Sequence, residues 1–365
     1  MERRADYSVV ANDPDTFLRL NPRQTAIDEA QLLPELFSAL RVAIDDHREE
    51  NGRFVVTGSS SPALVRSLSE SLAGRVAIIE MAPFSWAEVT ETVGADSFLK
   101  RLPDRQAAPQ ELMQGLEPRG PERLLHDFWF AGGFPQPWLK ASAAFRSRWI
   151  EQYIQTYLLR DVRRLFPGLD DVRFRRFLEM LGGLSGRVLN VAEVGRALGV
   201  SPPTARDYFE IAHGTFVWRT IPAYSRNVVK RVVKHPRGYL RDTGLLHALL
   251  RVPDLAALRS HPQAGASWEA MVVEEIIRQL NATGEAFEYS YYRTGAGAEV
   301  DLVIDASFGR IAFEIKSSST VGPRDLRALR DFVREQDARI GVVINNDIVP
   351  RHYDDKIIGL PMAWL

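Results

Sequence analysis

The sequence of 365 residues contains no cysteine, which rules out disulfide bonds, thiolate zinc sites and a cysteine nucleophile. No apolar run approaches the roughly 20 residues that a membrane-spanning helix needs. Residues 1–6 contain no apolar signal segment, so we expect a cytoplasmic protein without a membrane partner. The chain also lacks an excess of either charge, because 46 Lys and Arg nearly balance 47 Asp and Glu. Affinity for nucleic acid would therefore depend on local basic patches.

A further absence is the pattern G-x-x-x-x-G-K-[ST], whose backbone amides and lysine cradle nucleotide phosphates. The rest of the composition is ordinary. A hydrophobic content of 45% and a charged content of 25% are usual for a folded domain in water. The length is enough for about two or three domains.

Residues 298–319 are predicted to form two short strands around a turn at 305–310. Apolar side chains occupy alternate positions of both strands: Val300, Leu302, Ile304, Ile311, Phe313 and Ile315. Because strand side chains alternate between faces, each strand should have one apolar face and one face that carries charge. If the hairpin closes symmetrically, Asp301 lies opposite Glu314, and Glu299 opposite Lys316.

Two carboxylates that meet across a hairpin repel each other, and a hard divalent cation with oxygen ligands would offset this repulsion. We therefore expect Mg²⁺ or Mn²⁺ at Asp301 and Glu314. Lys316, two residues beyond Glu314, would hold and polarise a metal-bound water, which such sites activate against a phosphodiester. The alternative is an exposed hairpin face whose charges form salt bridges.

The spacing of Asp301, Glu314 and Lys316 resembles the PD-(D/E)xK restriction-endonuclease-like fold. A helix predicted at 267–280 precedes the hairpin, with apolar residues at helical spacing: Trp268, Met271, Val272, Ile276 and Leu280. The resemblance makes Glu269 the helix acid and gives a catalytic set of Glu269, Asp301, Glu314 and Lys316. Val300 stands where the family usually has proline. A strand at 287–293, a helix from Pro323 to about residue 335 and a strand at 338–345 complete the expected order.

The first 90 residues are predicted to be part of an α/β nucleotide-binding domain. Apolar strands at 53–56 and 76–80 and a helix at about 34–47 follow an acidic pair, Asp28-Glu29. Alternating strands and helices are typical of a parallel sheet, in which chemistry collects at the carboxyl ends of the strands. The acidic pair is also explained by the preference of helix N-termini for acids.

Most of the chain resembles a family of prokaryotic AAA-type ATPases that carry a winged helix and a C-terminal restriction-endonuclease-like domain of unknown function. The matching segments are IDEAQLLPEL, VVTGSSSPAL, ESLAGRVAIIEM, FAGGFPQP, YLLRDV, residues 189–250 and AEVDLVI…FEIKSS. The resemblance places Asp28 of a Walker B motif near Mg²⁺ and makes Glu29 orient the attacking water. It makes Ser59 or Ser60 a polar sensor. Arg75 would contact the γ-phosphate of ATP, in the same subunit or in a neighbouring copy of a homo-oligomer.

One departure from that family concerns the phosphate-binding loop, which lies upstream of Walker B in the family. Only 27 residues precede Asp28 here, and residues 7–13 match the second strand of the family core. We therefore expect residues 1–365 to lack the first strand, the loop and the first helix. We expect no ATP hydrolysis by this chain.

Residues 191–213 show helix-turn-helix spacing. Gly199 makes the turn and Ser201 caps the second helix, whose exposed first residues should include Thr204, Arg206 and Asp207. Strands are predicted at 216–221 and 238–241. The segment between them is basic, without an acidic residue: Arg226, Lys230, Arg231, Lys234 and Arg237. A basic wing beside a recognition helix suits DNA phosphates, and a winged helix that contacts protein is the alternative.

The predicted fold is an α/β multidomain protein with three modules. A partial P-loop NTPase core of AAA type covers residues 1–99, and a linker with a helical lid, including a long helical region at 146–177, covers 100–185. A winged helix-turn-helix covers 186–255 and a PD-(D/E)xK nuclease-like domain covers 262–365. Three functional classes remain: a DNA-associated AAA-type protein without ATP hydrolysis, a metal-dependent nuclease, and a non-enzymatic DNA-binding or scaffold protein.

Overall fold

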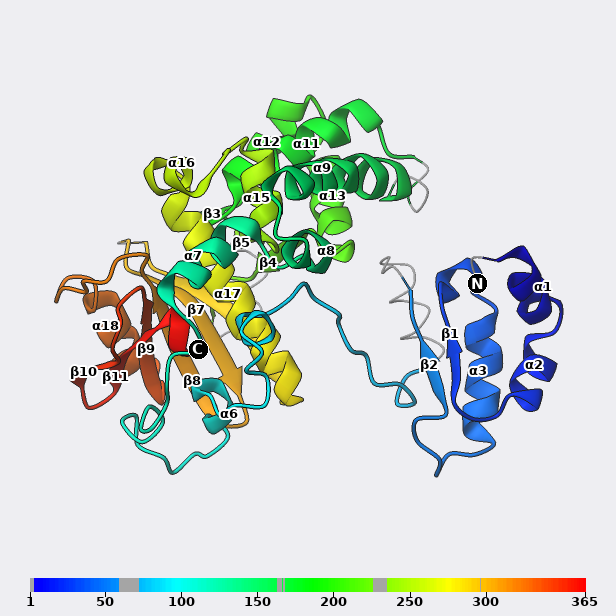
Figure 1. Ribbon diagram of the computed structural model, residues 1–365, viewed down its shortest axis with the longest axis horizontal. Coiled ribbons are helices and arrows are strands. Elements are labelled where there is room, and N and C mark those ends of the chain that lie inside the picture. Colours follow the sequence, from blue (N-terminus) through cyan, green and yellow to red (C-terminus); the bar gives the residue numbers. More distant parts are fainter. Residues whose placement is uncertain (1–2, 59–71, 163–165, 167, 226–234, 296) are drawn as a thin grey trace. The chain divides into compact units, whose positions relative to one another are not determined.

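The computed structural model describes residues 3–58, 72–162, 166, 168–225, 235–295 and 297–365 (Figure 1). The chain divides into two compact units, one of residues 1–80 with Phe209–Phe216 and one of residues 81–208 with 217–365. Several residues that the sequence pointed to lie outside the described part: Ser59, Ser60, Arg226, Lys230, Arg231 and Lys234. In the described part, none of the helices combines the length and the apolarity that crossing a membrane requires.

The first unit contains a two-stranded parallel sheet and helices. Its elements are α1 (Arg4–Asn12), α2 (Pro14–Leu20), β1 (Thr25–Ile27), η1 (Ala30–Leu32), α3 (Leu36–Asp45) and β2 (Phe54–Val56). Strand β1 pairs with β2 in parallel, and α3 connects the two strands in sequence. The apolar side of α3 packs with Ile27 and with residues of α2, which forms the core of this unit. The predicted strand at 53–56 and helix at 34–47 are thus close to what is found.

The strand predicted at 76–80 does not form. Among the described residues, the sheet of the first unit consists of β1 and β2 alone, and residues 76–80 are outside any strand. Ile78 and Ile79 are 66% and 85% exposed. An apolar β-type sequence becomes a strand only when a neighbouring strand accepts its backbone hydrogen bonds, and none of the described strands does so here.

The second unit is built around a six-stranded mixed sheet of order β10-β11-β9-β8-β7-β6. Its strands are β6 (Phe287–Arg293), β7 (Glu299–Ala306), β8 (Gly309–Ile315), β9 (Ile340–Asn345), β10 (Arg351–Asp354) and β11 (Ile357–Pro361). Strands β6, β7 and β8 are antiparallel, whereas β8, β9 and β11 run in parallel. The helix α17 (Ala264–Thr283), yellow in Figure 1, and α18 (Arg327–Glu335) flank this sheet.

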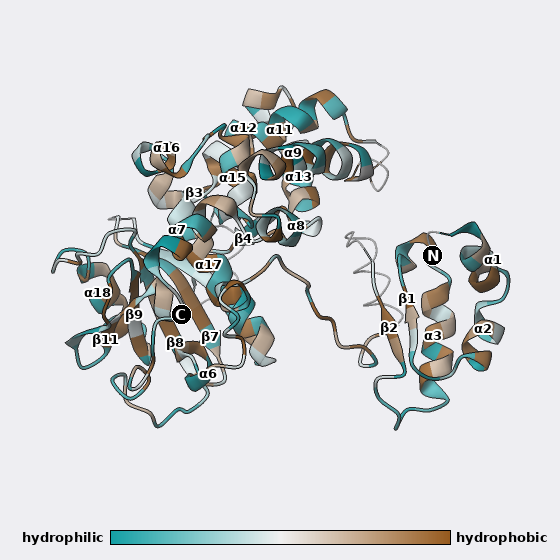
Figure 2. Ribbon diagram, viewed as in Figure 1, coloured by the Kyte–Doolittle hydropathy of each residue, from teal (hydrophilic) through white to brown (hydrophobic). Residues whose placement is uncertain are grey.

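Both faces of the hairpin β7–β8 are buried, which differs from the prediction of one charged face. Leu302 and Phe313 pack in the cluster that contains α17, whereas Val303 and Ala312 pack in the cluster that contains α18. The central strands are accordingly hydrophobic along most of their length (Figure 2). Asp301 and Glu314 are therefore carboxylates inside a two-sided core, at 9% and 7% exposure.

The alternation predicted for the first strand is wrong at one position. Val300 packs with the α18 cluster and not with Leu302. The register between β6 and β7 shifts between Ser290 and Tyr292, and such an irregularity breaks strict alternation. The hairpin turn is also shorter than expected, because the pairing continues to Ala306 and Gly309. Helix α18 begins four residues after Pro323, where the helix was predicted to begin.

The remaining helices of the second unit precede the sheet. They are α5 (Trp86–Val89), α6 (Phe98–Arg101), α7 (Glu122–Ala131), α8 (Pro135–Leu139), α9 (Ala143–Tyr153), the π-helix η2 (Ile154–Asp161), α11 (Asp171–Leu184), α12 (Val191–Leu198), α15 (Thr243–Leu249), α16 (Leu255–Ser260) and the part of α13 (Pro202–Gly214) up to Tyr208. The chain ends with η3 (Met362–Trp364). The helical region predicted at 146–177 is thus divided between α9, η2 and α11.

Residues 100–121, predicted as a linker, are packed against the six-stranded sheet. Leu112 and Leu116 are buried in the cluster that contains α17. The backbone N–H of Arg119 donates to the carbonyl of Ala363 at 2.8 Å, and its Nε donates to the carbonyl of Leu365 at 2.9 Å. The segment has turns instead of regular elements, but its leucines anchor it as part of the second unit.

The pair Gly132-Gly133 makes a close contact with the start of α15. Asp242 caps α15 by accepting the Leu245 N–H at 2.9 Å, and it accepts the Gly133 N–H at 2.8 Å. Gly132 has φ +72°, and a Cβ there would lie 2.3 Å from Asp242 Oδ1. The glycines therefore serve packing, because only a residue without a side chain fits beside the buried carboxylate.

Candidate functional site

Three elements bring the predicted catalytic residues together. Helix α17 carries Glu269, strand β7 carries Asp301, and strand β8 carries Glu314 and is followed by Lys316. Leu302 of β7 pairs with Phe313 of β8. Asp301 and Glu314 are the next residues beyond that pair, so they lie beside each other on neighbouring strands. Glu269, Asp301 and Glu314 thus lie close together, and Glu299 at the start of β7 joins them; we call these four residues the acid cluster.

An arginine that the sequence analysis assigned to the basic wing lies inside the acid cluster. Arg237 begins β5 (Arg237–Leu240), and its Nη1 donates to Glu269 Oε1 at 2.8 Å and to Asp301 Oδ1 at 3.2 Å. Its Nη2 forms an ion pair with Glu299. Arg237 is only 6% exposed. One guanidinium therefore neutralises carboxylates from α17 and β7.

Three further donors contact the acid cluster: a backbone N–H, the Tyr239 hydroxyl and Lys316. Asp301 Oδ2 accepts the Ile315 N–H at 2.8 Å, and the Tyr239 hydroxyl donates to Glu269. Lys316 Nζ donates to Glu314 Oε1 at 2.7 Å. Glu314 Oε2 is buried and has no hydrogen-bond partner in the described structure. Buried polar atoms are rarely left in this state.

Burial and neighbouring charges shift the pKa values of Glu314, Glu269 and Arg237. Burial raises the pKa of Glu314 to about 8, the Asp301 charge adds to this shift, and Lys316 opposes it. Burial together with Asp301 raises the pKa of Glu269 to about 7, against the opposing effect of Arg237. Burial lowers the pKa of Arg237, but Tyr239, Glu269 and Asp301 more than offset this, so its pKa is raised and it stays charged.

The acid cluster as placed does not fit a divalent metal ion. Such an ion needs several oxygens at about 2.0–2.6 Å, and these must not be committed to other donors. Among the described residues, no group of three or more His, Asp or Glu is arranged to hold a metal. Both oxygens of Asp301 are engaged by protein donors. Arg237 supplies the neutralisation that the sequence analysis had assigned to Mg²⁺ or Mn²⁺.

At the N-terminal unit, the acidic pair lies at the carboxyl end of β1, as predicted. Asp28 is exposed and accepts a hydrogen bond from the Thr57 hydroxyl, which lowers the pKa of Asp28. Glu29 has φ +55° and accepts from the Gln31 amide. Thr57 was not among the predicted site residues, although it directly follows the apolar strand β2 and so lies at the same edge. The described residues around this pair include no glycine-rich loop with a lysine of the kind that cradles nucleotide phosphates.

Arg75 is not brought together with Asp28. Its Nε and Nη2 bind the two oxygens of Asp45 at 2.7 and 2.8 Å, and this pair lowers the pKa of Asp45. Asp45 ends α3, which in a parallel β-α-β connection returns the chain to the amino ends of the strands. Arg75 thus binds at the edge opposite to Asp28.

The helix-turn-helix prediction describes α12 and the start of α13 well. Gly199 takes φ +67° at the turn, and the Ser201 hydroxyl accepts the Thr204 N–H at 3.3 Å as the cap of α13. Val194 and Leu198 bury the inner side of α12. Arg206 is exposed and Thr204 is half-buried. The short strands β3 (Arg187–Val188), β4 (Trp218–Ile221) and β5 form a sheet of order β3-β5-β4.

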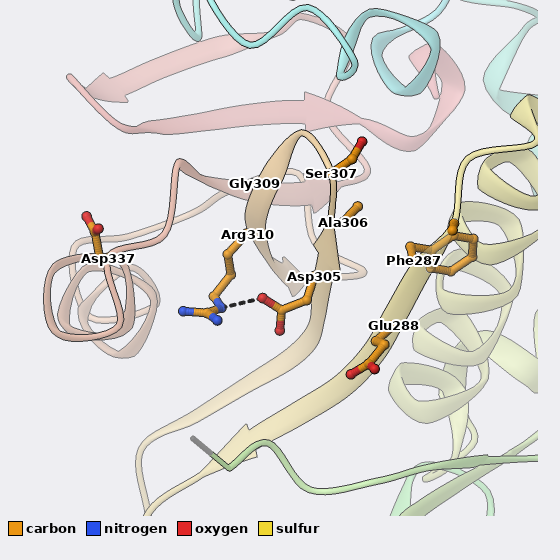
Figure 3. Close-up of a pocket in the computed structure, with 9 residues that line it drawn as sticks. Phe287, Glu288, Asp305, Ala306, Ser307, Gly309, Arg310 and Asp337 are labelled. Atoms are coloured by element: carbon orange, nitrogen blue, oxygen red, sulfur yellow. Dashed lines mark hydrogen bonds and ion pairs between the residues drawn. The ribbon is translucent and has the colours of Figure 1, made fainter. Parts of the chain in front are cut away.

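An open hollow lies elsewhere on the sheet, beside the turn between β7 and β8 (Figure 3). Asp305 and Arg310 line it and pair with each other at 2.7 Å. They stand at the turn end of the hairpin, whereas Asp301 lies toward the other end of β7. The hollow is therefore separate from the acid cluster and holds an already compensated ion pair.

A serine–histidine contact in the second unit is structural. His247 Nε2 lies 2.6 Å from Ser267 Oγ, and the Trp129 indole donates to the same oxygen at 2.9 Å. Ser267 and His247 are almost fully buried, and burial lowers the pKa of His247 to about 4. A nucleophile must reach its substrate, so this pair serves the packing of α15 against α17.

Comparisons with known proteins find three family models that match successive segments of the chain. Residues 2–90 match an AAA domain. Residues 122–256 and 264–365 match two domains of unknown function, DUF8612 and DUF4143. The expectation of an AAA-type N-terminal region is thereby confirmed.

Uncharacterized proteins of Mycobacterium tuberculosis and Mycobacterium bovis are each 35% identical over 318 residues, which are 87% of this chain and 64% of theirs. The chain is homologous to these proteins, and it spans less than two thirds of their length. No solved structure matches it.

Proposed function

We propose that this chain is a DNA-associated protein with an AAA domain, and that residues 187–240 contact duplex DNA as a winged helix. The observation that carries this proposal is the order of elements around α13. A capped helix-turn-helix pair is followed by β4 and β5, which join β3 in a three-stranded sheet. In helix-turn-helix proteins the second helix enters the major groove with its N-terminal residues.

The charges near that helix suit phosphate contacts. Arg206 is exposed near the start of α13, and Arg196 is exposed on α12. The sequence between β4 and β5 adds four basic residues and no acid: Arg226, Lys230, Arg231 and Lys234. Contacts of Lys and Arg with phosphates give affinity with little dependence on base sequence. We therefore propose weakly specific binding to duplex DNA.

Catalysis by residues 1–365 is not part of this proposal. The nucleotide-binding pattern G-x-x-x-x-G-K-[ST] is absent from the sequence, and Arg237 engages the acid cluster. One observation favours metal-dependent nuclease activity as a second candidate, namely the unpartnered Oε2 of buried Glu314. A divalent cation would bind that oxygen. Both oxygens of Asp301 already accept hydrogen bonds, however, so the cation would have too few further ligands.

The test is the affinity of the full chain for a short DNA duplex, measured by fluorescence anisotropy. Arg206→Glu should weaken binding about tenfold, because it replaces a favourable charge with a repulsive one beside the phosphates. Arg123→Glu is the matched control, since Arg123 is exposed on α7 and undergoes the same change of charge. Equal affinities of the two variants would show that α13 does not contact DNA.

A further inference from the structure

We propose that Arg237 is the resident cation of the acid cluster, and that it takes the place of a divalent metal ion and keeps such ions out. This inference is independent of DNA binding. It concerns why four acidic side chains gather between α17 and the hairpin β7–β8, and what holds them there.

The first argument is the position of the guanidinium. Its Nη1 lies 2.8 Å from Glu269 and 3.2 Å from Asp301, and Nη2 pairs with Glu299. These three acids come from a helix and a strand that meet only in the folded chain. A planar guanidinium with several donors can bind several carboxylates at once, as a metal ion does. Arg237 therefore acts as the common counter-ion of the cluster.

The second argument is that Arg237 is anchored. Its backbone pairs with Ile221 of β4 and Val188 of β3, so it is held on both sides. Its guanidinium lies 5.2 Å from the centre of the Tyr291 ring, which adds a cation–π contact. A metal ion could enter only by displacing a buried, fully charged side chain from three carboxylates. Loss of such a pair leaves uncompensated buried charge, which is strongly unfavourable.

The third argument is the ligand set that would remain without Arg237. Glu314 Oε2 is buried and has no hydrogen-bond partner in the described structure. Removal of the guanidinium would also free Oδ1 of Asp301 and leave Oε1 of Glu269 with the Tyr239 hydroxyl as its donor. Hard cations prefer several carboxylate oxygens of this kind. The cluster thus has the donors of a cation site, and Arg237 is what prevents a metal from using them.

The experiment measures the melting temperature of the full chain with and without Mn²⁺. The wild-type value should not change when Mn²⁺ is added, because Arg237 already neutralises the cluster. Arg237→Gln should melt lower than wild type without metal, and Mn²⁺ should raise its melting temperature by several degrees, because a ligand of the native state adds stability. Stabilisation of the wild type by Mn²⁺ would overturn the proposal without any variant.

Three further variants test whether the response of the melting temperature to Mn²⁺ arises at the acid cluster. Arg293→Gln removes another positive charge near Glu299, from a side chain that is 51% exposed, and should give no response to Mn²⁺. Arg237→Lys keeps a cation at the position and should also give none. The double variant Arg237→Gln, Glu314→Gln should lose most of the response of the single variant.

If Arg237→Gln does not fold alone, it is refolded from urea with and without Mn²⁺. Recovery that requires Mn²⁺ supports the proposal. Failure in both conditions, or recovery that is equal in both, contradicts it.

Discussion

Glu274 of α17 accepts hydrogen bonds from Arg219 of β4 through both of its carboxylate oxygens. Arg241 donates to Oε2 of the same carboxylate at 3.2 Å, and all three side chains are buried. Burial acts to raise the pKa of Glu274, but Arg219 and Arg241 outweigh it and bring the pKa to about 2. This ion pair ties the three-stranded sheet to the long helix beneath the six-stranded sheet.

The first prediction is a pH dependence of stability that depends on Glu274. Its folded pKa is below the ordinary value of 4.5, so its contribution is complete above about pH 4.5 and is lost as pH falls toward 2. The loss should be on the order of 2 kcal/mol by pH 3, out of about 3 kcal/mol in total below pH 2. Urea unfolding of wild type and Glu274→Gln between pH 6 and pH 3 measures it. The free energy of unfolding of the wild type should exceed that of Glu274→Gln at pH 6, and this difference should shrink as pH falls. A difference that stays constant with pH would contradict the low pKa of Glu274.

The second prediction concerns the turn beside Asp242. Gly132→Ala should destabilise the fold by about 3 kcal/mol or more, because the backbone is left-handed there and the new Cβ would collide with the Asp242 carboxylate. Gly183→Ala in α11 is the control, since its Cβ would meet nothing within 4 Å and alanine favours a helix. Similar melting temperatures for the two variants would contradict the packing described for Gly132.

The third prediction is that residues 1–365 release no phosphate from ATP above the background rate. Asp28 and Glu29 stand at the strand edge where an AAA domain works, but no phosphate-binding loop occurs in the sequence. Phosphate release with Mg²⁺ is measured for the wild type and for Glu29→Gln. Turnover that the substitution abolishes would mean that another segment of this chain holds the phosphates.

The hairpin and α17 could be predicted from sequence because their signals are local. Apolar residues recur with a period of two in β7 and β8 and at helical spacing in α17, and each pattern is complete within its own element. The cluster of Glu269, Asp301 and Glu314 followed from those elements. The strand expected at 76–80 failed because strand formation needs a partner, which a local pattern does not reveal.

Arg237 could not be predicted by the same reasoning. Its partners Glu269 and Asp301 lie 32 and 64 residues away in the chain and belong to other elements. Its neighbours in sequence are basic, which favoured an exposed wing. The one available signal was electrostatic, because the acids required a counter-charge, and a metal ion and an arginine both meet that requirement.

The salt dependence of duplex DNA binding tests the central claim of DNA association most directly. The affinity of wild type and of the triple variant Lys230→Ala, Arg231→Ala, Lys234→Ala is measured over a range of salt concentrations. The wild type should bind unrelated duplexes alike and lose affinity steeply with salt. The triple variant should bind more weakly, with a slope of log affinity against log salt that is flatter by up to about three. Identical affinity and slope in the two proteins would contradict the proposed role of the basic segment in DNA binding.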